Sequence, residues 1–438
     1  MMNIRIYAAL GAALLSGLTA RAQQPLPLSL AECRERALAH SEELQQADNR
    51  LEQARLDRRI AATAALPKIE GSATGAYVLP DMDMMGMDLR MRGTYMAGLN
   101  LTQPIYAGGK ISAARRMARI GEEVADEQRR MTRMDVLVEA DNAYWTTVAV
   151  DRQVRMLESY AAQMDTLYRQ TEAAFKAGMA IENDLMRIEA KRSEIRYQLQ
   201  KAQNGAELCR MSLCRVIGAE RDQYPVPTDT LFQTSEPGAL LPDLASRPEL
   251  RILEQQVAVG EQQIRDVRSA MLPSVGLSLG YTYYGNIKLQ SMVDAGNGTF
   301  IPHTQEFRDG LGLAMLAVKI PIFHWGESRK KVRKARYELQ NAQLDLQKNT
   351  RLMSLEVEQA IRNVEDGYRL IQTAGLALQQ AEENLRVMRN RYKAQMAPLT
   401  DLLDAQSQWQ QAASNQIEAQ TQYRIYETEY RRSIGTLE

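Results

Sequence analysis

The chain of 438 residues contains 54 basic and 54 acidic side chains, so its formal net charge is zero, and 45% of its residues are hydrophobic. A balanced charge provides no electrostatic footprint for a polyanion, so we expect no nucleic-acid partner. The few cysteines and histidines show no disulfide framework and no metal-ligand spacing: Cys33, Cys209, Cys214, His40, His303 and His324. We therefore expect cysteines that pack between helices, no resident cofactor and no metal.

The first residues predict a Sec signal peptide that covers 1–22. Arg5 precedes an apolar stretch at 6–18 that is too short to span a bilayer as a helix, and Ala20-Arg21-Ala22 fits a cleavage site. Gln23 follows the expected cut, whereas lipoprotein processing would need a cysteine there. No later segment offers the roughly 20 apolar residues of a membrane helix, so the mature chain would enter a membrane as strands.

Two copies of one structural unit follow each other in the sequence. Pro104-Ile105-Tyr106 matches Pro321-Ile322-Phe323 at an offset of 217, and residues 175–180 match 392–397 at the same offset. Upstream, Leu66-Pro67 matches Leu272-Pro273 at an offset of 206, so the difference of 11 residues falls in a hairpin between the matched segments. Such a sustained offset indicates an internal duplication.

Each unit is expected to contain a helix, two strands and a hairpin of two long helices. The first unit covers 23–223, with strands at about 68–78 and 93–105 and a helical hairpin at about 110–218. The second covers 242–438, with strands at about 274–284 and 310–323 and a hairpin at about 327–435. A proline-rich linker at 224–241 joins them. Ser29 and Glu32 have the spacing of a capping box, which would start a helix running to about Ala64.

The expected strands show the weak alternation of a membrane β-barrel. Val275, Leu277, Leu279, Tyr281 and Tyr283 alternate with small or polar residues, and strands of about 10 residues can cross a bilayer when they are tilted. Four strands cannot close a barrel, and open edges would leave backbone groups unpaired in lipid, so several copies would share one sheet. The alternative is a soluble pair of β-hairpins packed on the helices. Polar loops at 81–92 and 285–309, together with the signal peptide, favour the membrane interpretation.

Heptad seams dominate the expected helical hairpins. In the last third of the chain, apolar residues recur in steps of four and three: Met353, Val357, Ala360, Val364, Gly367, Ile371, Ala374, Leu378, Ala381, Leu385, Met388 and Tyr392. The helix at 110–174 would be roughly 100 Å long at about 1.5 Å per residue, so one chain could not cover its flanks. Periodicity alone favours a coiled-coil rod, but the duplicated strand pairs favour the wall of a tunnel.

Three segments carry a resemblance to a known family. They are residues 28–38, which open with Leu28-Ser29-Leu30-Ala31-Glu32, residues 99–109 and residues 392–406. In this order they resemble the N-terminal helix, the strand-to-helix signature and the second helical-hairpin turn of the TolC-like outer membrane efflux proteins, also called outer membrane factors. The resemblance covers nearly the whole mature chain.

The resemblance implies a mainly α fold with membrane β structure. Three subunits with four strands each would form a 12-strand β-barrel, continuous with a trimeric α-barrel tunnel. It implies an outer-membrane location in a Gram-negative-type bacterium, with the helices extending into the periplasm. The partners would be a periplasmic adaptor and an inner-membrane transporter, and the chain would be a passive channel subunit of a tripartite efflux or secretion system.

The resemblance also assigns roles to residues at the hairpin turns. Asp401 and Asp404 match the acidic positions that ring the periplasmic aperture in the family, and Asp184 and Tyr392 match a latch of the closed state. Asp401 is also placed to cap the returning helix, and both roles are compatible for this residue.

The chain departs from the family at two positions near this latch. Ala397 stands where the family has an arginine, and Gln395 stands where it has a glycine. This sequence therefore lacks the arginine of the family's salt bridge, and Arg391 or Lys393 would have to supply the cation instead.

Two other classes of protein fit the sequence less well. A non-membrane periplasmic scaffold or adaptor would contain a single hairpin flanked by β-rich domains, whereas this sequence contains two strand-bearing copies. An enzyme would need a catalytic or ligand-binding motif, but no Ser-His-Asp order, metal spacing or phosphate-binding loop occurs. Gly108-Gly109 fits a strand-to-helix turn, and we expect no enzymatic activity.

Overall fold

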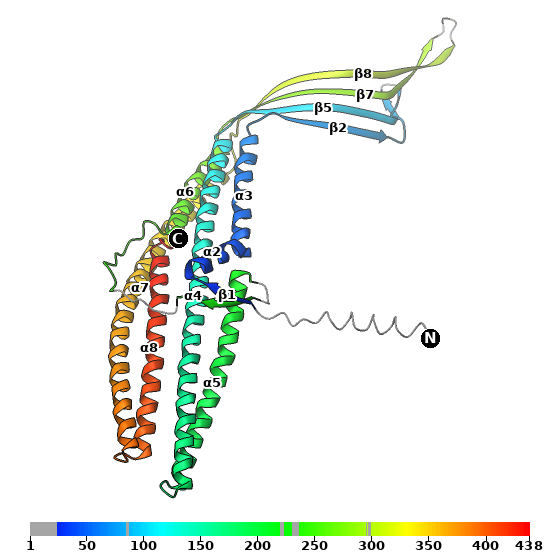
Figure 1. The fold of residues 1–438 in the computed structure, drawn as a ribbon. Coiled ribbons are helices and arrows are strands. Elements are labelled where there is room, and N and C mark those ends of the chain that lie inside the picture. Colours follow the sequence, from blue (N-terminus) through cyan, green and yellow to red (C-terminus); the bar gives the residue numbers. More distant parts are fainter. Residues whose placement is uncertain (1–23, 85–86, 220–222, 230–235, 295, 297–298) are drawn as a thin grey trace, which may run out of the picture. The chain divides into compact units, whose positions relative to one another are not determined.

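The computed structural model describes residues 24–84, 87–219, 223–229, 236–294, 296 and 299–438, and the expected signal peptide at 1–22 lies outside them. The helices are α2 (Leu30–His40), α3 (Glu42–Thr63), α4 (Lys110–Lys176), α5 (Glu182–Ile217), α6 (Pro248–Ser269), α7 (Glu327–Lys393) and α8 (Leu399–Ser433) (Figure 1). The strands are β1 (Gln24–Leu28), β2 (Lys68–Tyr77), β3 (Met82–Met84), β4 (Met87–Arg90), β5 (Arg92–Ala107), β6 (Gln223–Pro227), β7 (Ser274–Asp294) and β8 (Phe300–Lys319). Among the described residues, no helix combines the length and the apolar character that crossing a membrane requires.

The chain forms two compact units, and each unit contains parts of both sequence repeats. The first unit is made of Met1–Asp48, Glu127–Leu250 and Lys348–Glu438, and the second of Asn49–Asp126 and Arg251–Gln347. Both helical-hairpin turns belong to the first unit, and the large sheet belongs to the second. The two repeats are therefore not two separate domains, because pieces of both share each unit.

The capping box at the start of α2 is confirmed. The Glu32 N–H donates to Ser29 Oγ at 3.3 Å, and the Ser29 N–H donates to Glu32 Oε2 at 2.9 Å. The helix does not continue to Ala64 without a break, because Ser41 has an extended backbone and separates α2 from α3. Its Oγ accepts a hydrogen bond from the Leu44 N–H at 3.1 Å. A serine that caps a new helix in this way competes with continuation of the old one.

A buried ion pair joins α2, α4 and α8 in the first unit. The Asp141 carboxylate is 0% exposed and accepts two hydrogen bonds from the Arg34 guanidinium, at 2.7 and 2.6 Å. Thr428 Oγ1 donates a third to the same carboxylate at 2.6 Å. These partners make the buried charge tolerable, since an unpaired carboxylate here would be strongly destabilising. Burial also raises the pKa of the neighbouring Cys33 thiol to about 12.

The expected linker at 224–241 begins with a strand. β6 pairs with β1 in parallel, from Gln24↔Gln223 to Leu28↔Pro227, and the Thr228 N–H donates to the Leu28 carbonyl at 2.9 Å. Prolines fit this sheet because both of its strands are edges, where a missing N–H can face away from the partner. The second unit is expected to open with a helix from about Pro242 to Met271, but α6 starts later, at Pro248, and proline suits the first position of a helix.

The large sheet has the strand order β2-β5-β7-β4-β3, and β8 also pairs with β7. The β2–β5 and β7–β8 hairpins share one register. Adding 206 to the β2 residue and 217 to the β5 residue converts the pair Lys68↔Thr102 into Ser274↔Lys319, which is the pair observed. The duplication seen in the sequence therefore extends to the individual hydrogen-bonded residues.

The strands of the second repeat are longer than expected. β7 continues to Asp294 and β8 starts at Phe300, so most of the expected loop at 285–309 is strand. Asn286, with φ of 59°, lies at an irregularity between Tyr284 and Ile287, beyond which pairing resumes. β8 ends at Lys319, ahead of Pro321, which has no N–H for the ladder.

The heptad seam of α7 faces the interior of the first unit. Val357, Val364 and Ile371 are buried, as the sequence pattern predicts. Gly367 is the small residue that lets an aromatic side chain approach, because a Cβ added there would lie 3.2 Å from the ring of Tyr426. The seam residues of α7 therefore pack against α8.

Candidate functional site at the helical-hairpin turns

The turn between α7 and α8 closes with a left-handed residue. Gln395 has φ of 56°, its N–H donates to the Tyr392 carbonyl at 3.0 Å, and the Met396 N–H donates to the Arg391 carbonyl at 2.8 Å. These bonds satisfy carbonyls that a helix end otherwise leaves free. α8 then begins after Pro398, and no side chain caps it.

The turn between α4 and α5 repeats this geometry at the 217 offset. Gly178 has φ of 75°, its N–H donates to the Phe175 carbonyl at 2.9 Å, and the Met179 N–H donates to the Ala174 carbonyl at 2.8 Å. α5 follows at Glu182. The two hairpins lie side by side in Figure 1, with their turns at the same end. Residues of both turns therefore lie at the same end of the paired hairpins.

Asp401 and Asp404 are exposed, and both lie in the first two turns of α8. Their neighbours Leu402 and Ala405 are buried, so the two carboxylates project from the other side of the helix. The Thr400 hydroxyl lies 3.4 Å from Asp401 Oδ1. Asp401 does not cap α8, because the cap position is Pro398, but a carboxylate in the first turn still favours the helix dipole.

Tyr392 and Asp184 stand on different helices, α7 and α5. The Tyr392 hydroxyl lies 3.4 Å from Oγ1 of Thr171, a buried residue of α4. Asp184 occupies the first turn of α5, and its N–H donates to the Ile181 carbonyl. Within the part of the chain that the structure describes, no hydrogen bond joins Asp184 to Tyr392.

An apolar cluster packs the four hairpin helices together next to the turns. It combines residues of all four hairpin helices: Tyr160, Met164, Leu167, Ile188, Ile195, Leu385, Leu399, Leu402 and Ala405. The rings of Tyr160 and Trp409 meet edge to face with centroids 6.0 Å apart, and burial raises the pKa of Tyr160 to about 12. Because the cluster is shared, neither hairpin can move freely against the other in this state.

Polar contacts that the sequence does not reveal also join the hairpins. Arg389 Nη2 donates to Gln163 Oε1 at 2.6 Å, and Gln410 Nε2 donates to Gln198 Oε1 at 2.6 Å. Arg389 lies one helical turn before Tyr392 and shares with it a groove of 420 Å³. Arg389 is thus a cation that bridges the two hairpins near their turns, at a position that the sequence analysis did not single out.

The described residues contain no group of three or more His, Cys, Asp or Glu side chains that could hold a metal ion. Cys33, Cys209 and Cys214 are free thiols. Cys33 is buried, and the other two are half-buried on α5. The turns thus present charged and hydroxyl side chains at the end of the paired helical hairpins.

Comparison with known proteins gives consistent matches over both repeats. A model described as outer membrane efflux protein matches residues 33–217 and 243–436. Outer membrane protein TolC of Vibrio cholerae is 22% identical over 383 residues, which are 86% of this chain and 83% of that protein. The pyoverdine export outer membrane protein OpmQ of Pseudomonas aeruginosa is 24% identical over 384 residues, 85% of this chain and 77% of that protein. A crystal structure of CusC aligns with a TM-score of 0.78 at 17% identity, over 95% of this chain and 94% of that chain.

Proposed function

This chain belongs to the outer membrane efflux protein family and is located in the outer membrane, and from this premise we propose that it is one subunit of a trimeric, passive export duct. The proposal rests chiefly on the edges of the large sheet. Within the described residues, β2 pairs only with β5, and β8 pairs only with β7. Backbone groups need partners in lipid, and three copies joined β8 to β2 would close a barrel of 12 strands.

The surface of the sheet supports a membrane environment. Leu99 and Tyr281 are paired across β5 and β7, and both side chains are exposed. Ile69 on β2 and Leu316 on β8 are exposed as well. Contiguous exposed apolar surface of this kind marks a membrane or an interface, and alternation between apolar and polar faces is the pattern of membrane strands.

The paired helical hairpins would form the wall of the duct below the barrel. Twelve helices from three copies would enclose a tunnel in the periplasm, and the hairpin turns would meet a periplasmic adaptor and an inner-membrane transporter. The transporter would supply the energy, so the chain itself needs no catalytic residue. Cell fractionation tests this arrangement, because a non-membrane scaffold would be released without detergent.

Asp401 and Asp404 are proposed to line the periplasmic aperture. Three copies would bring six carboxylates around one axis, and a ring of acidic side chains favours cations. Replacing both residues, Asp401→Asn with Asp404→Asn, is expected to reduce cation selectivity and block by multivalent cations in planar bilayers. Asp366→Asn is the matched control, since this exposed carboxylate lies on α7 away from the turns. Unchanged selectivity in the double variant would reject the aperture role.

Asp184 and Tyr392 are proposed to restrain the closed entrance. Because the Tyr392 hydroxyl lies on Thr171 here, Thr171→Val separates the contribution of that contact from the contribution of Asp184. Asp184→Ala and Tyr392→Phe are each expected to raise single-channel conductance. A latch made with Asp184 is ruled out if Asp184→Ala conducts like the unmodified chain.

A further inference from the structure

The junction between β5 and α4 is closed by a tight contact inside the chain. Gly108 has φ of 59°, and a Cβ built on it would lie 2.6 Å from the Ser269 carbonyl oxygen and 2.9 Å from Leu272 Cβ. These two residues form the turn between α6 and β7, and β7 pairs with β5. Only glycine fits here, because any side chain would meet the backbone of that turn.

The junction between β8 and α7 has the same backbone but no cover. Trp325 occupies the position of Gly108 at the 217 offset and also has a positive φ, of 48°. Trp325 is 85% exposed, and Ile322 before it is 91% exposed. A Cβ added to the following Gly326 would meet nothing within 4 Å. A bulky residue in the left-handed region is rare, and here most of its surface is exposed.

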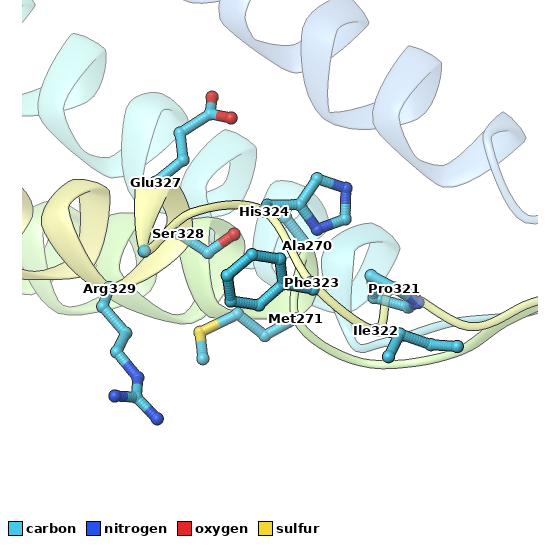
Figure 2. A pocket seen from close by; sticks show the side chains of 10 residues that line it. Ala270, Met271, Pro321, Ile322, Phe323, His324, Glu327, Ser328 and Arg329 are labelled. Carbon is cyan, nitrogen blue, oxygen red and sulfur yellow. The ribbon is translucent and has the colours of Figure 1, made fainter.

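The contacts within the chain leave this junction unfilled. A cavity of 260 Å³ lies between the end of α6 and the start of α7. In Figure 2, Phe323 lies beside Met271, and Ile322 points away from it. The rings of Phe323 and Trp325 meet with centroids 5.1 Å apart. Phe323 therefore lies against the α6–β7 turn, whereas Trp325, which packs on Phe323, stays largely exposed.

The repeat identifies which segment would cover it. The turn that covers Gly108, residues 269–272, corresponds at the 206 offset to residues 63–66, the turn between α3 and β2. In this chain the outer edge of β2 has no partner strand among the described residues, and Leu66 is exposed. A second copy that paired its β2 with β8 would bring residues 63–66 to Trp325, as β7 brings residues 269–272 to Gly108.

We propose that Trp325 fills the seam between two copies, with its indole against residues 63–66 of the adjacent copy. This inference rests on the trimer of the proposed function. The spacing at Gly108 cannot recur at this seam, because a Cβ there would approach backbone atoms within 2.6 Å. The seam between copies is therefore wider than the seam inside one chain, and the indole occupies the difference.

The test places a fluorophore that indole quenches on one side of the seam and Trp325 of the adjacent copy on the other side. Chains with Leu66→Cys and Trp325→Phe are labelled with bimane and co-assembled with chains that retain Trp325. Only a neighbouring copy can then supply the indole at position 325, and we expect a loss of bimane emission. Co-assembly with unlabelled Trp325→Phe chains is the control, in which emission stays high. Label on Cys33, Cys209 or Cys214 contributes equally to both mixtures.

The possible outcomes separate this inference from the trimer itself. Trimers with equal emission in both mixtures would overturn the placement of Trp325, and quenching of its own emission by brominated phospholipid would then locate it in the lipid interface. Failure of the unmodified chain to form trimers in size analysis would overturn the proposed function, and this inference with it. Quenching that depends on Trp325 in the partner copy supports the proposal.

Discussion

The first and second repeats have left-handed residues at the same four places in the backbone, and at two of these places the side chains differ. Gly108, Gly109, Gly178 and Gly218 have positive φ, and so do their counterparts Trp325, Gly326, Gln395 and Gly435. At the hairpin turns, helix-ending hydrogen bonds hold Gly178 and Gln395 in this form, so glycine is favoured there but not required, whereas only glycine fits at Gly108. The comparison teaches that the duplicated backbone tolerates a side chain where nothing in the same chain packs against it.

The surroundings of the two long helices differ in the same manner. Asp141 of α4 is buried under α2 and α8, whereas Glu358, its counterpart on α7, is exposed. The difference arises because Arg34 of α2 and Thr428 of α8 both bind Asp141.

The largest expected effect is on this buried pair. Asp141→Ala should lower the free energy of unfolding of the first unit by about 3–5 kcal/mol, because it leaves the Arg34 guanidinium without its partner. Glu358→Ala, the matched change in the second repeat, should alter it by less than about 0.5 kcal/mol. Denaturant unfolding in detergent, followed by helical circular dichroism, measures both. Equal losses would mean that the repeats are equivalent here.

A second contrast lies beneath the hairpin turns, where Ile188 of α5 corresponds to Ala405 of α8 and both are buried. Ile188→Ala should cost about 3 kcal/mol, since the cavity is enclosed by all four helices. Ala405→Ile should cost about 1–3 kcal/mol by overpacking the same cluster. The double variant, which carries both changes, should lose less unfolding free energy than the two single variants lose in total. If the losses simply add, the two residues do not share one cavity.

The strand-to-helix junctions provide the third contrast. Gly108→Ala should cost roughly 2–3 kcal/mol, because it adds backbone strain and a contact with the α6–β7 turn. Gly326→Ala should cost only the strain, about 1 kcal/mol, since its surroundings are open. Thermal dissociation of the assembled protein on gels ranks the two variants. A larger shift for Gly326→Ala would contradict the open junction.

The smallest effect concerns the turn residues. Gln395→Gly should stabilise the second hairpin by roughly 1 kcal/mol, because the backbone at this position is left-handed and glycine adopts it without strain. Gly178→Gln should destabilise the first hairpin by a similar amount. Melting temperatures of the two variants should shift in opposite directions, and a shift in the same direction would show that side-chain contacts dominate at the turns.

Much of the fold could be predicted from the sequence because it is repetitive or local. The matched segments around Pro104 and Pro321, the capping box at Ser29 and the seam through Val357 are all patterns in neighbouring or regularly spaced residues. The break at Ser41 and the strand that opens the linker depend on competing local hydrogen bonds. A polar composition at 285–309 suggested a loop, yet pairing with β8 makes most of it strand.

At the candidate site, the sequence predicted the acidic residues but not the polar contacts between the helices. Asp401 and Asp404 were identified from their positions in the motif, and both are exposed in the structure. The contact of Tyr392 with Thr171 and the bridge from Arg389 to Gln163 depend on how α4 and α7 are rotated against each other. Periodicity defines which face of a helix is buried, but not which polar residues at its margin meet.

The shared register of the two strand hairpins has a consequence for biogenesis. On the route to the proposed trimer, each separate copy would present unpaired backbone along β2 and β8, and such strand edges are templates for uncontrolled growth. The pattern that joins correct neighbours would equally join chains into open filaments. In the proposed trimer, a closed ring forms only when closure is faster than the addition of a fourth chain, so overproduction should divert the protein into aggregates.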